Sequence, residues 1–289
     1  MPTIGFIGGG NMAKSLIGGL ITAGISPSDI TVAEPDSIQR QSLEHTYKIN
    51  SSDDNNATLK CDIVLLAVKP QLLKTVCEQL DTNRLNSNPG GSQESTLFIS
   101  IAAGVKSTDI DHWLNHNGSS EQDYKQHAIV RCMPNTPSLL QCGAAGLFAN
   151  DIVSDQQKQQ AENIMKAVGI VIWVSSEDQL NAVTAVSGSG PAYFFLLMEA
   201  MQQAGETLGL SADVAQKLVL QTALGASRMA IESDTSAAEL RKNVTSKGGT
   251  TEQAILSFQS DHFHTIVLNA LTAANNRSIS LAEELGAEK

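Results

Sequence analysis

Residues 245–251 (TSKGGTT) place four hydroxyl groups, a lysine and two adjacent glycines in one short stretch. A glycine inside a helix costs about 1 kcal/mol relative to alanine, so the pair predicts the end of one helix and, from Thr250, the beginning of the next. Backbone N–H groups at a helix N-terminus bind anions. The stretch holds no His, Cys, Asp or Glu. Its chemistry therefore favours the binding of a carboxylate-bearing amine or imine over acid–base catalysis.

A second glycine-rich stretch, FIGGGNMA, lies near the beginning of the chain and sets Gly8, Gly10 and Ala13 in G-x-G-x-x-A spacing. That spacing alone is weak evidence. Here apolar residues 4–7 predict a strand directly before it, and residues 11–22 predict a helix directly after it. Glycine lets the backbone approach a pyrophosphate, and the helix N-terminus offers it free N–H groups. In this context the motif predicts dinucleotide binding.

The end of the second predicted strand reads AEPD, and Glu34 follows the glycines at about the distance typical of an acid that holds an adenosine ribose 2′-hydroxyl. Glu34 and Asp36 would repel a 2′-phosphate, which favours NAD(H). Arg40 would offset that repulsion if it folds back over the site. The sequence therefore leaves NAD(H) and NADP(H) open.

Three more stretches follow predicted strands or open a helix. Lys69, beside Pro70, would meet a phosphate or ribose, or would be a solvated lysine. Residues 100–104 (SIAAG) leave room for a ring against the backbone. Residues 131–137 (RCMPNTP) and 186–193 (VSGSGPAY) fit structural turns as well as they fit a site, and Pro191 suits the first turn of a helix.

The elements that must position these residues alternate over the first part of the chain. Short apolar, β-branched runs are separated by helical patterns such as residues 71–80 and 155–168, which predicts an α/β fold with a parallel, Rossmann-like sheet. Long Ala-, Leu- and Met-rich helices follow. We expect a dinucleotide-binding domain over residues 1–174 and a helical domain over 175–289. The predicted strands are residues 3–7, 30–33, 63–68, 97–101, 128–132, 144–148 and 170–174, and the predicted late helices are 191–208, 212–231 and 262–285.

Composition narrows the classes of function. A net charge of −11 gives no basic surface for nucleic acid. The four cysteines form no C-x-x-C pair and no histidine cluster accompanies them, so no metal site is expected. No signal peptide and no apolar run of the roughly 20 residues that a membrane helix needs is evident. We expect a soluble, cytoplasmic protein, with exposed polar connections at residues 81–95 and 115–127 and no histidine acting as a catalytic base.

Taken in order, FIGGGNMA, AVKPQ, SIAAG, RCMPNTP, VSGSGPAY and SKGGTT resemble the motifs of the pyrroline-5-carboxylate reductases nearly end to end. The resemblance implies an enzyme that passes hydride from C4 of a reduced nicotinamide, NADPH or NADH, to the C5 imine carbon of L-1-pyrroline-5-carboxylate, giving L-proline. The helical domain would pair with that of another subunit, as a homodimer or a pentamer of dimers. The substrate would lie between the nicotinamide and the loop that matches SKGGTT.

The resemblance also implies roles for individual residues. Thr251 matches the threonine that bonds the imine nitrogen, and Ser187 matches the start of an active-site helix. The loop that takes the substrate carboxylate matches Ser246, Gly248, Gly249, Thr250 and Thr251. The cofactor would be bound by Gly8, Gly10, Asn11, Met12, Ala67, Lys69, Pro70, Ala102, Ala103 and Gly104. Lys247 is a departure, because many members carry proline there.

Two other classes compete with this interpretation. A β-hydroxyacid dehydrogenase shares the domain order, but it typically carries a catalytic lysine after its second glycine turn, and residues 191–203 contain none. A non-catalytic dinucleotide-sensing protein would explain FIGGGNMA but gives no reason for SKGGTT. Oxidation of the cofactor by the imine separates these alternatives.

Overall fold

The computed structural model describes residues 2–86, 95–116 and 124–287. The chain divides into two compact units, one of Met1–Ser189 with Ala274–Lys289 and one of Gly190–Ala273. The domain boundary expected after residue 174 stays a prediction. Parts of the two expected polar connections, residues 87–94 and 117–123, lie outside the described residues. Within those residues, no helix is long and apolar enough to span a bilayer.

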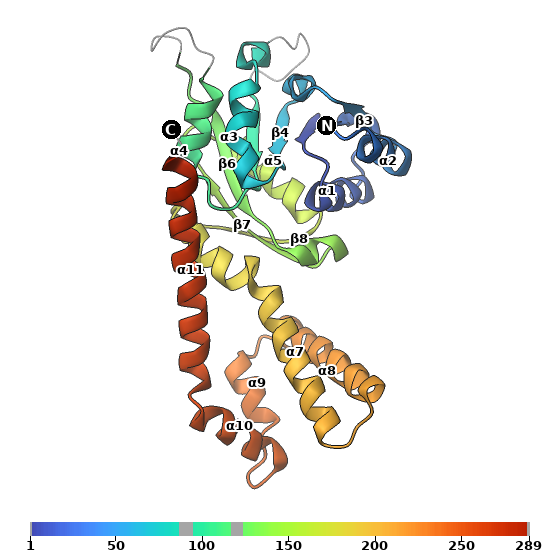
Figure 1. Ribbon diagram of the computed structural model, residues 1–289, viewed down its shortest axis with the longest axis vertical. Coiled ribbons are helices and arrows are strands. Elements are labelled where there is room, and N and C mark those ends of the chain that lie inside the picture. The colour runs from blue at the N-terminus through green and yellow to red at the C-terminus, as the bar shows by residue number, and fades with distance from the viewer. Residues whose placement is uncertain (1, 87–94, 117–123, 288–289) are drawn as a thin grey trace. The chain divides into compact units, whose positions relative to one another are not determined.

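One sheet of eight strands organises the first unit (Figure 1). Its strand order is β3-β2-β1-β4-β5-β6-β7-β8, and all neighbours pair in parallel except β6 and β7. The seven predicted strands are confirmed. The short β3 was not predicted, because its sequence NSS is polar and offers no apolar run. The strands are β1 (Ile4–Ile7), β2 (Ile30–Ala33), β3 (Asn50–Ser52), β4 (Ile63–Leu66), β5 (Leu97–Ser100), β6 (Ala128–Met133), β7 (Gly143–Ala149) and β8 (Gly169–Trp173).

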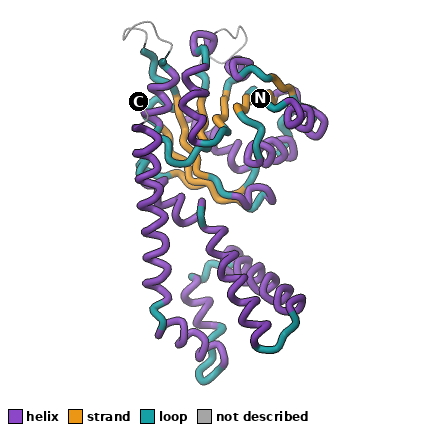
Figure 2. Tube along the Cα trace, viewed as in Figure 1, coloured by secondary structure: helices purple, strands orange, loops and turns teal. Residues whose placement is uncertain are grey.

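Helices cover both faces of this sheet (Figure 2). Successive side chains of a strand point to opposite faces, and in β1 Phe6 belongs to one apolar cluster and Ile7 to the other. The first cluster also holds side chains of α1 (Asn11–Thr22), α2 (Ser37–Tyr47) and α5 (Asp155–Lys166). The second holds those of α3 (Pro70–Gln79) and α4 (Ser107–Leu114). Burial on both faces explains why central strands such as β1 and β4 read as continuous runs with no polar side chain.

The strand order reverses beside β1. The chain runs outward from β1 through β2 to β3, and then returns to place β4 on the other side of β1. Ligands of open α/β sheets bind outside the carboxyl ends of the strands at such a switch point. The glycine turn after β1 and the Lys69–Pro70 turn after β4 both lie at this edge.

The Met1–Ser189 part of the first unit ends in an unusual helical turn. The sequence predicted a break around residues 186–190, but α6 (Gln179–Val183) continues through a π turn over Thr184–Gly188. The backbone N–H of Ser189 donates to the carbonyl of Thr184 at 2.8 Å, five residues back. Single π turns inside helices are frequent at functional sites. The helix therefore continues from α6 through this region, and Gly188 lies in the wider π turn.

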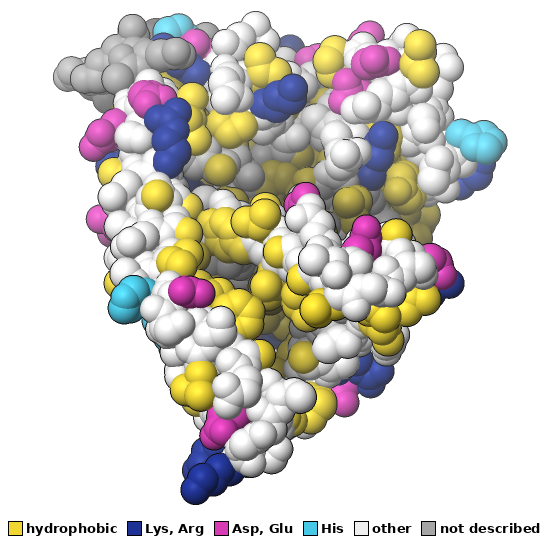
Figure 3. Space-filling model, turned by 60° about the horizontal axis from the view of Figure 1, so that its bottom comes forward, with side chains coloured by type: hydrophobic (Ala, Val, Ile, Leu, Met, Phe, Trp, Pro, Cys, Tyr) yellow, Lys and Arg dark blue, Asp and Glu magenta, His cyan; other side chains and the backbone are white. Residues whose placement is uncertain are grey.

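The second unit is entirely helical over its described length. The expected long helices are confirmed, with α7 (Gly190–Thr207), α8 (Ala212–Glu232), α9 (Ala237–Asn243), α10 (Thr250–Ser260) and the first part of α11 (Phe263–Ala287). Apolar side chains remain on its surface: Phe194, Phe195 and Leu196 are 61%, 64% and 65% exposed. Hydrophobic side chains recur over the face turned to the viewer in Figure 3. Exposed apolar surface of this extent marks an interaction site.

Candidate functional site

The glycine turn after β1 has the geometry that dinucleotide binding needs. Gly8 has φ +97°, and a Cβ added to it would lie 2.7 Å from the carbonyl oxygen of Ala67. Gly10 caps α1, and an added Cβ there would meet nothing within 4 Å. Open space therefore faces the N-terminus of α1, where Asn11 and Met12 begin the helix. This space and these N–H groups fit a pyrophosphate.

The other predicted cofactor residues lie at neighbouring strand ends. Ala67 follows β4 and donates its N–H to the carbonyl of Ile7 at 2.9 Å, beside the glycine turn. Lys69 is exposed and caps α3, with Pro70 at the first helical position. After β5, Ala102 is buried and Gly104 has φ +76°. The structure thus brings the predicted cofactor residues to one edge of the sheet, with Ala103 between the last two.

Glu34, which follows β2, makes one contact with the glycine turn and another with Arg40 of α2. The carboxylate of Glu34 accepts a hydrogen bond from the N–H of Gly9 at 2.9 Å. The guanidinium of Arg40 folds back, and its Nη1 donates to the carbonyl oxygen of Glu34 at 2.6 Å. The positive charge of Arg40, whose position the sequence left open, therefore lies at the carboxyl end of β2.

The RCMPNTP loop is joined to the π turn. The side-chain amide of Asn135 donates to the carbonyl of Ser187 at 3.1 Å and accepts from the N–H of Ala144 at 2.9 Å. The hydroxyl of Ser187 donates to the carbonyl of Val183 at 3.0 Å. Sequence reasoning did not single out Asn135. The available signal was an amide between two prolines in a loop at a strand end.

The expected loop lies in the second unit, at residues 244–249 between α9 and α10. α9 ends at Asn243, before the glycines, and Thr250 begins α10 as predicted, with Gly249 as its N-cap. Gly248 has φ +74°, which favours glycine. Its N–H donates to the carboxylate of Glu252 at 2.7 Å, and the N–H of Gly249 donates to the carbonyl of Ser246 at 3.0 Å.

Two of the N–H groups expected for a substrate carboxylate are therefore satisfied within the loop. Over the described chain, the N–H groups of Thr250 and Thr251 make no hydrogen bond. Thr251 is half-buried and Thr250 exposed, as are Ser246 and Lys247. Glu252 is a residue that sequence reasoning missed. Its signal was available, because a Glu at the third helical position commonly reaches back to the N-cap.

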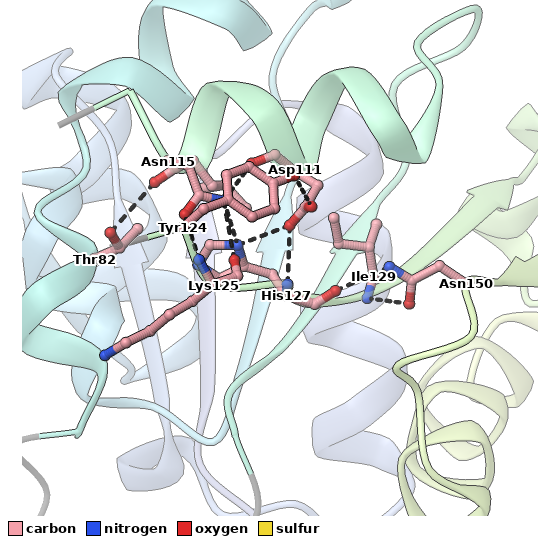
Figure 4. Close-up of polar contacts among 9 residues, drawn as sticks. Thr82, Asp111, Asn115, Tyr124, Lys125, His127, Ile129 and Asn150 are labelled. Carbon is pink, nitrogen blue, oxygen red and sulfur yellow. Dashed lines mark hydrogen bonds and ion pairs between the residues drawn. The ribbon is translucent and has the colours of Figure 1, made fainter. Parts of the chain in front are cut away.

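Two partly buried polar clusters of the first unit lie apart from the glycine turn. Arg131 pairs with Glu177, whose carboxylate also accepts the N–H of Ser107 at the start of α4. Figure 4 shows the second cluster, in which Asp111 accepts hydrogen bonds from His127 and Tyr124. His127 precedes β6, so it lies at the amino end of a parallel strand, opposite the expected ligand edge.

Two segments of the chain match known families. A family described as NADP oxidoreductase coenzyme F420-dependent matches residues 3–104. A family described as pyrroline-5-carboxylate reductase dimerisation matches residues 177–281. These segments contain the glycine turn and the 246–251 loop respectively.

Relatives match over nearly the full length. A pyrroline-5-carboxylate reductase of Pseudomonas aeruginosa is 49% identical over 99% of this chain and 98% of its own. The solved pyrroline-5-carboxylate reductase of Coxiella burnetii is 46% identical, covers 97% of this chain and 98% of its own, and superposes with a TM-score of 0.87. That of Plasmodium falciparum, solved with NADP bound, is 29% identical, covers 97% of this chain and 98% of its own, and has a TM-score of 0.79. The chain belongs to the pyrroline-5-carboxylate reductase family.

Proposed function

We propose that this chain reduces L-1-pyrroline-5-carboxylate to L-proline, with the 246–251 loop binding the substrate and the switch-point edge of the sheet binding NADPH or NADH. The observation that carries the proposal is the N-terminus of α10. There the N–H groups of Thr250 and Thr251 have no hydrogen-bond partner within the described chain. The hydroxyl of Thr251 belongs to the same helix N-terminus. The 49% identity to the Pseudomonas aeruginosa reductase over nearly the full length supports the proposal.

The cofactor residues fit a nicotinamide dinucleotide. The space over Gly10 and the N–H groups of Asn11 and Met12 suit the pyrophosphate. Ala67, Lys69 and Pro70 would line the ribose, and Ala102, Ala103 and Gly104 would line the ring, because these small or turn-forming residues lie at adjacent strand ends. When bound, the reduced nicotinamide supplies the hydride.

The substrate loop has positioning as its main task. Reduction of the imine adds a hydride to carbon and a proton to nitrogen, and the imine can arrive already protonated as an iminium. We assign the carboxylate to the N–H groups of Thr250 and Thr251, helped by the α10 dipole. Gly248 and Gly249 shape the turn, Ser246 closes it, and Thr251 Oγ1 orients the imine nitrogen or relays a proton through water. Holding reactants in place can supply several kcal/mol of the barrier.

Ser187 is assigned a positioning role as well. Its hydroxyl and carbonyl are both engaged, with Val183 and Asn135. It therefore acts by holding the π turn rather than by offering a free hydroxyl in this arrangement.

The test follows loss of nicotinamide absorbance on adding pyrroline-5-carboxylate, with NADPH and NADH assayed side by side. Wild type should oxidise the cofactor, and chiral amino-acid analysis should find L-proline. Thr251→Ala should lower kcat roughly a hundredfold through misplacement of the imine, and Thr251→Ser should restore most of it. Thr245→Ala is the matched control, because the hydroxyl of Thr245 is already bonded to the carbonyl of Arg241.

The other outcomes separate the alternatives. Equal rates for wild type and Thr251→Ala would keep the reductase and remove Thr251 from its mechanism. Cofactor binding without oxidation, in protein shown to be folded, would contradict the reductase and favour a dinucleotide-sensing protein. Oxidation of a 3-hydroxy acid, with reduction of NADP⁺ or NAD⁺, would favour the β-hydroxyacid dehydrogenase class.

The second unit provides an oligomer interface in this proposal. It lies in the segment matched by the dimerisation family and exposes Phe194, Phe195 and Leu196. We propose a homodimer formed through these helices, and a pentamer of dimers as the larger assembly. Native mass spectrometry tests both, since a monomer at working concentration would contradict them. The cytoplasmic location expected from the sequence stays a prediction.

A further inference from the structure

The side chain of Glu34 is occupied within the protein. It follows β2, where an acid of a dinucleotide-binding fold normally faces the adenosine ribose. Its Oε2 accepts hydrogen bonds from the N–H of Gly9 at 2.9 Å and from Nε2 of Gln39 at 2.9 Å. Its Oε1 accepts from the N–H of Asp36 at 3.0 Å. Glu34 is only 8% exposed.

These contacts build Glu34 into the glycine turn. A carboxylate has about four acceptor positions, and three of them are already used here by donors of the protein. A Cβ added to Gly9 would lie 3.2 Å from Glu34 Oε2 and 2.5 Å from the Leu43 side chain, so Gly9 is enclosed between these two residues. Releasing Glu34 to bind a ribose would leave the buried N–H of Gly9 without its acceptor, which is costly.

Arg40 presents the free charge at the same strand end. It lies in the first part of α2, and its Nη1 donates to the carbonyl oxygens of Glu34 at 2.6 Å and Pro35 at 3.4 Å. Over the described residues, its Nε and Nη2 make no hydrogen bond, and no carboxylate pairs with it. The Asp36 carboxylate is turned to the N-terminus of α2, where Oδ1 accepts from the N–H groups of Ile38 and Gln39.

We infer that Arg40 is the residue that recognises the 2′ position of the adenosine ribose, that it binds a 2′-phosphate, and that Glu34 is a positioning residue of the glycine turn. The site thereby selects NADP(H) over NAD(H). The inference rests on the proposed function for its cofactor class. Arginine suits a phosphate because its planar fork gives two charge-assisted hydrogen bonds, and Nε and Nη2 are the pair that Arg40 leaves available.

Binding of two nucleotides that differ only at this position tests Arg40 without catalysis. Isothermal titration calorimetry would compare adenosine 2′,5′-bisphosphate with adenosine 5′-monophosphate. Wild type should bind the bisphosphate about tenfold to a hundredfold more tightly. Arg40→Gln should abolish that difference and leave the monophosphate unchanged, and Arg40→Lys should keep part of it. Arg84→Gln, which removes an exposed arginine paired with Asp81, is the control. Equal affinities in wild type would overturn the inference.

A second variant separates positioning from recognition at Glu34. Glu34→Gln replaces one carboxylate oxygen by an amide NH₂ group. That group cannot accept hydrogen bonds from the N–H donors around it, so the glycine turn is disturbed. KM should rise by the same factor for NADPH and NADH, with kcat unchanged and with equal losses of NADP⁺ and NAD⁺ affinity. Weaker NAD⁺ binding together with tighter NADP⁺ binding would show that Glu34 reads the ribose, and would overturn the inference. Absence of reductase activity in a protein that binds both nucleotides would contradict the proposed function alone.

Discussion

Asn135 and Ser187, from segments 52 residues apart, are joined by a hydrogen bond of 3.1 Å between a side-chain amide and a backbone carbonyl. A helical carbonyl normally accepts from the N–H four residues on, which here is Pro191, and proline has no N–H to give. The amide of Asn135 supplies the missing donor. The loop after β6 is therefore hydrogen-bonded to the π turn at a carbonyl that Pro191 leaves without its helical donor.

Asn135→Asp should disturb this arrangement. The substitution places a carboxylate oxygen against the carbonyl of Ser187, so the free energy of unfolding should fall by about 1–3 kcal/mol. Because Ser187 belongs to the predicted site, kcat should fall as well. Urea denaturation and steady-state kinetics measure the two effects. Asn163→Asp is the control, since Asn163 is exposed and its side-chain oxygen accepts a hydrogen bond from Gln159, which a carboxylate oxygen would also accept. An unchanged kcat would separate the π turn from catalysis.

Gly8→Ala should lower the stability of the fold, whereas Gly10→Ala should lower its affinity for the cofactor. At Gly8 the added Cβ meets the carbonyl of Ala67 at 2.7 Å and φ is +97°, so the fold should lose stability, by roughly 1–2 kcal/mol from the backbone alone. At Gly10 the space is open and φ is −66°, so stability should be unchanged while cofactor affinity falls. Thermal unfolding and nucleotide titration distinguish them. Unchanged affinity in Gly10→Ala would place the pyrophosphate elsewhere.

Glu252 should have two separable effects on the substrate. Its carboxylate holds the N–H of Gly248, but it also brings negative charge to a loop proposed to bind a carboxylate. Glu252→Gln keeps an oxygen acceptor and removes the charge, so KM for pyrroline-5-carboxylate should fall about two- to fivefold. Glu252→Ala loses the acceptor, and kcat/KM should fall. Glu232→Gln, an exposed glutamate paired with Arg228, serves as the control. A raised KM in Glu252→Gln would show that its charge aids binding.

The acid stability of the first unit should depend on Asp111. Burial raises the pKa of this carboxyl, but hydrogen bonds from His127 and Tyr124 outweigh burial, and the net pKa is lowered (Figure 4). A lowered pKa in the folded state contributes stability above the ordinary aspartate pKa, and that contribution is lost as pH falls through the folded value. Asp111→Asn should therefore lose stability at neutral pH and show a flatter decline in acid.

Urea denaturation from neutral to acidic pH checks this expectation, with Asp155→Asn as the control. Asp155 is the first residue of α5, and its carboxylate is fully exposed. Parallel pH curves for wild type and Asp111→Asn would show that Asp111 does not control the decline.

Much of the architecture followed from local patterns. The buried strand β4 is apolar over its whole length, β5 is apolar up to its last residue, Ser100, and the glycine turn lies directly between a strand and a helix. The π turn was not predicted, because glycines and a proline locally favour a break, whereas the amide that sustains the helix comes from Asn135, far along the chain. The same holds for Glu34. Its position after β2 suggested a free acid, and only tertiary contact with Gly9 shows that it is occupied.

The first unit includes Ala274–Lys289, which is synthesised only after the whole of the second unit. Within that segment, Leu281 packs against Gly104, 3.4 Å from where a Cβ would be, and the hydroxyl of Ser278 contacts the amide oxygen of Asn181 at 2.8 Å. Domains generally fold as they leave the ribosome, from the N-terminal side onward. The sheet can thus form early, whereas the contact of Leu281 with Gly104 can form only after the second unit has been synthesised. Translation of the helical segment therefore sets the earliest moment at which the nucleotide-binding part is complete.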